Sequence, residues 1–237
     1  MTDRLDQAQL DELWDFGDPS ASEERLRAAS AAARATQKAE LETQVARSLG
    51  LQGRFDEADA VLDAIDTAEG VVAVRVALER GRVLNSSGHP LEAVPKFEIA
   101  LDRAKLIGHD FLTVDAAHML AIADPENSAA WTDRALATTD ATTDARTRRW
   151  AVSLHNNRGW NLHDSGSYDA ALAEFEAALA AALDTGTAEQ QHMAKWAVAR
   201  CLRSLGRVDE ALAIQEQLLI DQPDDEYVAE ELTELRK

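Results

Sequence analysis

A short frame that recurs along the chain constrains its fold more than any other feature of the sequence. Each copy has a glycine, four further residues and an alanine, and the successive glycines are separated by 35, 78 and 40 residues. Because 78 is twice 39, we expect a degenerate copy near residue 123, and Ala123–Ser128 has turn-forming residues there without the glycine. The four clear copies are Gly53–Ala58, Gly88–Ala93, Gly166–Ala171 and Gly206–Ala211.

The residues around each frame predict two helices. A small residue stands seven positions before each turn glycine and allows two helix backbones to approach closely; these residues are Ala46, Gly81, Gly159 and Ala199, with Ala116 in the degenerate copy. About twelve residues after each glycine, apolar residues recur at helical spacing, at Ile65, Leu101, Leu179 and Leu218. Each repeat is therefore predicted to be a helix, a glycine turn and an antiparallel helix.

This pattern resembles the tetratricopeptide repeat family, which combines a small residue on the first helix, a turn glycine, and an alanine and a large aromatic residue on the second helix. The best match has Gly159, Gly166, Ala171 and Phe175, and Pro223 supplies the proline that ends the last copy. The resemblance implies a right-handed α-solenoid in which the first helices line a concave groove that binds other proteins.

The expected fold class is thus all-α, a right-handed α-solenoid of about five antiparallel helix pairs within a single domain, 1–237. The pairs are predicted at 37–68, 71–107, 109–138, 144–184 and 187–222. Residues 1–36 are expected to form an N-terminal partial repeat. Residues 223–237, apolar on one side and charged on the other, are expected to form a capping helix.

Composition narrows the class of protein further. The chain has 43 acidic and 24 basic residues and a formal net charge of −19, which disfavours binding to nucleic acid or to anionic lipid. Ala and Leu greatly outnumber Val and Ile, which excludes a β-sandwich or barrel. The acidic start has no apolar signal segment, and Ala177–Leu183 is too short to span a membrane. We therefore expect a soluble, cytoplasmic protein.

The sequence has none of the strong catalytic motifs, such as a glycine-rich phosphate loop, a zinc helix or a nucleophile elbow. Cys201 is the single cysteine and is interpreted as a small buried hydrophobe. His155, His163 and Asp164 are the best candidates for an enzymatic site, but the two histidines are about two helical turns apart. The prediction is a protein that is not an enzyme and has no catalytic residues, metal site or cofactor.

Candidate binding residues are found on the predicted first helices, which would face the groove. Arg47, Arg82, Trp160 and Arg200 occupy equivalent positions, and Asn85, His163 and Arg203 form the next row. Arginine offers forked donors to anions, asparagine can pair with a peptide backbone, and tryptophan anchors apolar side chains. The full predicted peptide-binding set is Arg47, Arg82, Asn85, Asn156, Asn157, Trp160, His163, Trp196, Arg200 and Arg203.

These residues leave several functions open. The first is a scaffold or adaptor that binds an acidic or C-terminal peptide of a partner protein in the groove. The alternative is a regulatory sensor for a small signalling peptide or an anionic metabolite, and an enzyme is the third. Arg80, Arg82 and Arg158 could instead neutralise acidic second helices. Self-association into a homo-oligomer is also possible, since solenoids expose long helix faces.

Overall fold

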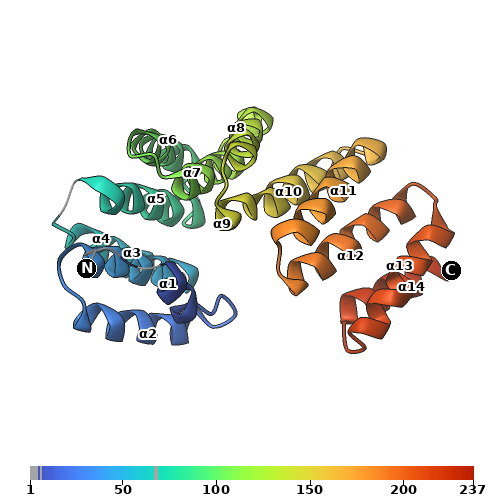
Figure 1. Ribbon diagram of the computed structural model, residues 1–237, viewed down its shortest axis with the longest axis horizontal. Helices are drawn as coiled ribbons and strands as arrows, with labels where there is room; N and C mark the ends of the chain where they lie inside the picture. The colour runs from blue at the N-terminus through green and yellow to red at the C-terminus, as the bar shows by residue number, and fades with distance from the viewer. Residues whose placement is uncertain (1–4, 6, 67–68) are drawn as a thin grey trace. The chain divides into compact units, whose positions relative to one another are not determined.

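The computed structural model describes residue 5, residues 7–66 and residues 69–237. The chain divides into two compact units, 1–134 and 135–237. Within the described residues every regular element is a helix, and chain neighbours pack against one another in antiparallel pairs (Figure 1). The expected all-α class of stacked helix pairs, an α-solenoid, is confirmed. The single-domain expectation for 1–237 stays a prediction.

Unit 1 begins with two helices that precede the first predicted pair. They pack on the rest of the unit through Leu10 and Leu26, which belong to one buried cluster with Leu41 and Leu62. The helices α3, α5 and α7, which come first in their pairs, also contact one another in succession. The elements are α1 (Gln7–Leu13), α2 (Pro19–Ala32), α3 (Ala35–Leu51), α4 (Phe55–Asp63), α5 (Gly70–Ser86), α6 (Pro90–Leu106), α7 (Asp110–Ala123), the 3-10 turn η1 (Pro125–Asn127) and α8 (Ser128–Ala141), which crosses the unit boundary.

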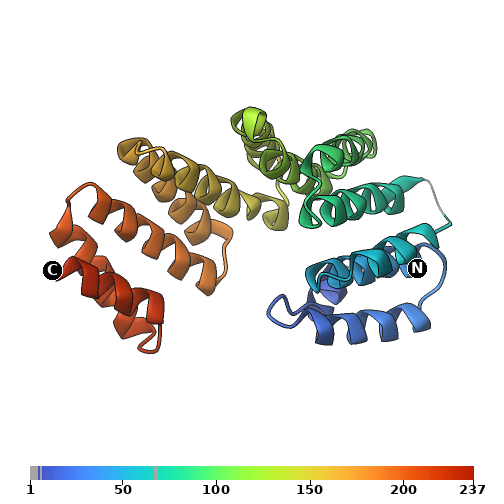
Figure 2. The same cartoon turned by 180° about the vertical axis from the view of Figure 1, so that it is seen from behind.

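Unit 2 repeats this arrangement. Its first helices α10 and α12 contact each other, and α12 also contacts the terminal helix α14. In Figures 1 and 2 the ribbons of α12, α13 and α14, orange to red, lie side by side. Val228 and Leu232 of α14 are buried against Leu218, as expected of a capping helix. The elements are α9 (Ala145–Arg148), α10 (Trp150–Asp164), α11 (Tyr168–Thr185), α12 (Ala188–Ser204), α13 (Val208–Asp221) and α14 (Glu226–Leu235).

The frame glycines end the first helices with one recurring turn. At Gly166, φ is +79°, a left-handed conformation that glycine adopts without steric cost. The Gly166 N–H donates to His163 O, and the next N–H, of Ser167, donates to Leu162 O. The same two bonds recur at Gly53, Gly88 and Gly206. This motif closes the end of a helix and reverses the chain, so the frame specifies the hairpin.

Two of the small residues on first helices, Gly81 and Gly159, face an aromatic ring of the second helix. Phe97 and Phe175 are fully buried. A Cβ atom on Gly159 would lie 2.6 Å from Phe175 Cε1, and one on Gly81 would come closer still to Phe97. Glycine at these positions therefore makes room for a ring between the two helices of a pair.

The helices lie within a few residues of the predicted pair boundaries. Three places along the chain need separate description. Residues 67–68, inside the predicted 37–68 pair, lie outside the described residues. The expected first helix at 144 is broken at Arg149, so that α9 precedes α10. At the degenerate copy, Ala123 stands at the glycine position. The carboxylate of the next residue, Asp124, accepts hydrogen bonds from Asn127 and from Trp131 Nε1, the latter at 2.9 Å.

Candidate interaction surfaces on the first helices

The ten predicted site residues all lie on first helices, but they belong to different units. Arg47, Arg82 and Asn85 lie on α3 and α5 of unit 1. The other seven lie on α10 and α12 of unit 2. The structure therefore offers two surfaces, the unit 1 surface (α3, α5) and the unit 2 surface (α10, α12), and each is described by itself.

Trp160 is the centre of an aromatic cluster on the unit 2 surface. Its ring centroid lies 4.8 Å from that of Phe175, 5.3 Å from His163 and 6.0 Å from Trp196. His163 in turn lies 5.0 Å from the ring of Tyr168. Edge-on and tilted contacts of this kind hold aromatic side chains in fixed orientations. Both tryptophans stay partly exposed, so they offer a rigid apolar surface.

Asn156 and Asn157 lie on α10, within one turn of Trp160. Asn157 is exposed and Asn156 is partly exposed. In the part of the chain that the structure describes, neither side-chain amide makes a hydrogen bond. Each amide therefore has a donor and an acceptor available to a bound group.

The two arginines of α12 are already paired within the protein. Arg200 Nε lies 3.1 Å from Glu231 Oε1, and Arg203 Nε lies 2.8 Å from Glu231 Oε2. Arg200 also donates a 2.8 Å bond to Ser204 Oγ, which lies 2.9 Å from His163 Nε2. Glu231 belongs to α14 and occurs among its buried apolar positions, which is a signal that the sequence analysis did not use.

Arg82 is likewise paired, in a buried charge cluster on the unit 1 surface. Its two terminal nitrogens lie 2.5 Å from Glu79 Oε1 and 2.5 Å from Asp115 Oδ1. Burial disfavours the charge on Arg82, but Asp115 and Glu79 outweigh burial and raise the pKa of Arg82. Burial also opposes the charge of Asp115, yet Arg82 and Arg47 lower the pKa of Asp115 below its usual range. Both groups are therefore charged at neutral pH.

Arg47 differs from the other three arginines of the predicted site. It forms no ion pair with any described residue, and its guanidinium carbon lies 5.6 Å and 5.2 Å from the ring centroids of Trp14 and Phe16. Burial, followed by repulsion from Arg82, lowers the pKa of Arg47 to about 10, so it stays charged at neutral pH. Trp14 and Phe16 precede Arg47 by about thirty residues, so local sequence spacing does not connect them with this site.

The interpretation that arginines neutralise the second helices is right for two of its three residues. Arg80 lies 2.5 Å from Asp63 of α4, and Arg158 lies 3.5 Å from Glu174 of α11. For Arg82 that interpretation is wrong, since both of its acids belong to first helices. The two rows of candidate binding residues on the first helices contain no acidic residue. Acidic residues outside these rows nevertheless pair with Arg82, Arg200 and Arg203.

The histidines considered for catalysis have separate partners. His155 Nδ1 lies 2.7 Å from Glu174, whereas His163 contacts Ser204. Among the described residues no group of His, Cys, Asp and Glu is arranged to hold a metal ion. Cys201 is buried, and burial raises the pKa of its thiol.

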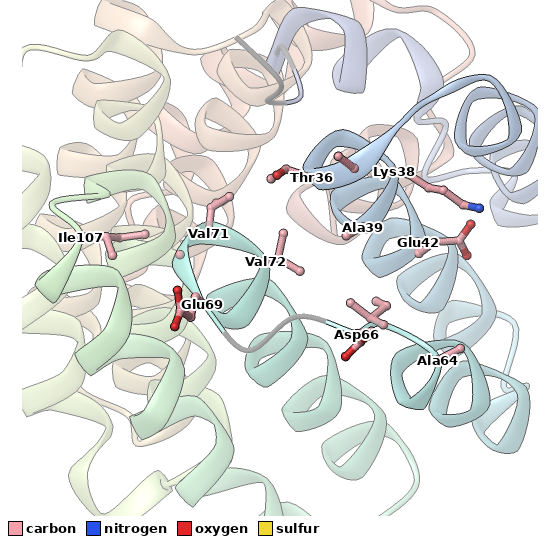
Figure 3. A pocket seen from close by; sticks show the side chains of 13 residues that line it. Thr36, Lys38, Ala39, Glu42, Ala64, Asp66, Glu69, Val71, Val72 and Ile107 are labelled. Carbon is pink, nitrogen blue, oxygen red and sulfur yellow. The ribbon is translucent and has the colours of Figure 1, made fainter.

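One cavity lies away from all ten predicted residues. It has a volume of about 800 Å³ and opens between the start of α3, the end of α4 and the start of α5 (Figure 3). Its ionisable lining consists of Glu42, Asp66 and Glu69 with Lys38. No helix in the described ranges is both long and apolar enough to cross a membrane.

Comparison with known proteins agrees with this geometry. Residues 156–226 match the model of the tetratricopeptide repeat family, over the segment that contains Gly159, Gly166 and Phe175. Two hairpins of unit 1 repeat the same turn, at Gly53 and Gly88, and one of them repeats the glycine–phenylalanine contact, between Gly81 and Phe97. Residues 156–226 are therefore identified as tetratricopeptide repeats, and the helix pairs of unit 1 are similar to them in fold. Such repeats generally mediate interactions between proteins and are typically without enzymatic activity.

One solved structure shows a likeness in fold. The crystal structure of BtubC (BKLC) from P. vanneervenii is similar with a TM-score of 0.63 and 16% identity, over 90% of this chain and 90% of that one. The crystal structure of the P58(IPK) TPR domain has a TM-score of 0.35 and 18% identity, over 93% of this chain and 65% of that one. No curated protein sequence matches the chain.

Proposed function

We propose that the chain is a non-enzymatic scaffold that binds a peptide segment of a partner protein on the unit 2 surface. The observation that carries the proposal is the pair of unbonded amides, Asn156 and Asn157, beside the aromatic cluster of Trp160 and Trp196. The proposal places the interaction in the cytoplasm, where the lone Cys201 remains a thiol.

The chemistry of this surface suits an extended peptide. An asparagine amide can accept from a backbone N–H and donate to a backbone carbonyl at once, so it binds a peptide whatever its side chains are. The two tryptophans then select for an apolar side chain, because rigid aromatic anchors lose little entropy on binding. Amides and aromatics of neighbouring first helices together supply affinity and some specificity.

Glu231 restricts the charge of the peptide at α12. It neutralises Arg200 and Arg203, and an acidic or C-terminal carboxylate group would have to displace it to reach either arginine. The segment that crosses α12 is therefore proposed to be uncharged.

The alternative, a sensor for an anionic metabolite, has less support. The 800 Å³ cavity is large enough for a small molecule. However, an anion there would face Glu42, Asp66 and Glu69, and Lys38 is the sole cation among the described lining residues. A partner peptide on the first helices requires no such repulsion.

The experiment is an affinity capture from native lysate followed by mass spectrometry. Wild type is compared with the Asn156→Ala, Asn157→Ala double variant and with Gln217→Ala, which removes an exposed amide from the second helix α13. Wild type and Gln217→Ala are expected to capture the same partner, and the double variant to lose it. Capture of that partner by all three proteins would contradict the proposal. Light scattering on the same samples tests self-association.

A further inference from the structure

We propose that a pocket around Arg47 on the unit 1 surface binds the carboxylate of an Asp or Glu side chain in a partner peptide, next to an apolar residue of that peptide. This inference rests on the proposed function, since the occupant is a segment of a partner protein. It concerns other residues, however, and unit 1 alone supplies all of them.

The first support is the charge state of the cluster. Glu79 and Asp115 both contact Arg82, and Glu40 lies 3.4 Å from Arg75. Arg47 has no acid within ion-pair distance among the described residues. A desolvated guanidinium without an ion pair gains more from a carboxylate than an exposed one does, because less water competes for its donors.

The second support is the shape of the site. Arg47 lines a pocket of about 200 Å³ together with Arg82, Glu79, Leu51, Val83 and Met119. Arg47 also lies against Trp14 and Phe16, whose rings stack 4.8 Å apart at an angle of 4°. This stacked pair holds the guanidinium in place before a ligand arrives, which reduces the entropy lost on binding.

The third support is the apolar rim. Phe16 is 60% exposed and Leu51 is 53% exposed, which is high for large apolar side chains. Leu51 lies one helical turn beyond Arg47 on α3, and the ring of Phe16 lies 5.2 Å from the Arg47 guanidinium carbon. Exposed apolar side chains close to one cation fit an acidic residue inside a peptide, with an apolar neighbour on the rim.

The surrounding charge limits the number of acids. Glu79 lines the same pocket, and the whole chain has a net charge of −19. A run of acidic residues would therefore be repelled, whereas a single acid in an apolar context gains the contact with Arg47 at little electrostatic cost. The site selects a single carboxylate.

The test is selection from a phage-displayed library of random heptapeptides flanked by Gly-Ser on both sides, panned on the full chain. The expected peptides contain one Asp or Glu next to an apolar residue. Replacing that acid by its amide should weaken binding to wild type about tenfold or more by fluorescence polarisation. This step needs no protein variant, so it stands even if a variant misfolds.

Protein variants then locate the contact. Arg47→Gln should weaken the acidic peptide about tenfold and remove the preference for acid over amide. Arg103→Gln, which removes an exposed arginine of α6 in the same unit, should change neither. Phe16→Ala, at an exposed side chain, should weaken binding while leaving the melting temperature near that of wild type.

Four results would overturn the inference: no enriched peptide, enriched peptides without an acid, equal binding of acid and amide peptides, or unchanged binding to Arg47→Gln. Binding that needs a free C-terminal carboxylate in place of an internal acid would also overturn it. If binding of the selected peptides requires Asn156 and Asn157 but not Arg47, the proposal of an Arg47 pocket is wrong and the proposed function still stands.

Discussion

Gln215 takes the position in the last helix pair that Phe97 and Phe175 hold in two earlier pairs, nine residues after the turn glycine. It is fully buried, and neither atom of its amide finds a hydrogen-bond partner in the described residues. We expect Gln215→Leu to stabilise the protein by about 1–3 kcal/mol, because the unpaired amide no longer has to be desolvated. Urea denaturation followed by circular dichroism measures this; a loss of stability would mean that the amide is satisfied in solution.

The contact between Gly159 and Phe175 gives a second prediction at this scale. Gly159→Ala should destabilise the protein by about 1–3 kcal/mol, because the new Cβ overlaps the buried ring. This occurs although alanine favours a helix over glycine by about 1 kcal/mol. Adding Phe175→Leu should recover part of the loss, so the two changes are not additive. Additive losses in the double-mutant cycle would contradict the contact.

At the scale of elements, the N-terminus of α14 is tied to α12. Asp225 caps α14 by accepting from the Val228 N–H, and its carboxylate lies 2.8 Å from His192 Nε2. Burial raises the pKa of Asp225, but the Val228 bond and His192 outweigh burial, and the net shift lowers the pKa below its usual 3.8. A lowered pKa adds stability above pH 3.8, and this stability is lost as the pH falls through the folded-state pKa.

We therefore expect Asp225→Ala to cost about 0.5–2 kcal/mol at pH 7, and the cost to shrink as the pH falls below 3.8 toward the folded-state pKa of Asp225. Urea denaturation of both proteins at several pH values measures the difference. Glu226→Ala, one position into α14 and exposed, is the control. A difference that grows as the pH falls below 3.8 would contradict a charged cap.

The helices themselves were largely predictable, and the reason lies in the turns. A left-handed glycine at the end of a first helix is a local requirement, so Gly53, Gly88, Gly166 and Gly206 mark hairpins directly in the sequence. The break at Arg149 was not predictable, since no glycine or proline stands there. Periodicity identifies a helix face but does not show where a helix is interrupted.

The candidate site was predictable only in part. The spacing of the ten residues relative to the turn glycines correctly predicts that they lie on first helices, because the position of a residue on a helix face follows from local sequence. Their partners could not be predicted in the same way. Glu231 is 28 residues from Arg203, and Asp115 is 33 residues from Arg82, so their pairing depends on how helices stack. The distinction between a paired Arg200 and an unpaired Arg47 belongs to the tertiary structure.

At the scale of the whole molecule, unit 2 has buried clusters of its own. Phe175, Cys201 and Leu235 lie in one of them, and Leu218 and Val228 lie in another. We expect the fragment 144–237, which starts in the loop after α8, to be helical by circular dichroism and to unfold cooperatively in urea. A fragment without cooperative unfolding would support the single domain, 1–237, expected from the sequence.

The contacts of Gly81 with Phe97 and of Gly159 with Phe175 also bear on how such a chain can change over time. A second helix with phenylalanine fits a first helix with glycine, whereas Ala46 is matched by Leu62 and Ala199 by Gln215. Recombination that exchanges one helix between repeats would bring alanine against a ring. The viable unit of duplication is therefore the whole hairpin, with breakpoints between pairs.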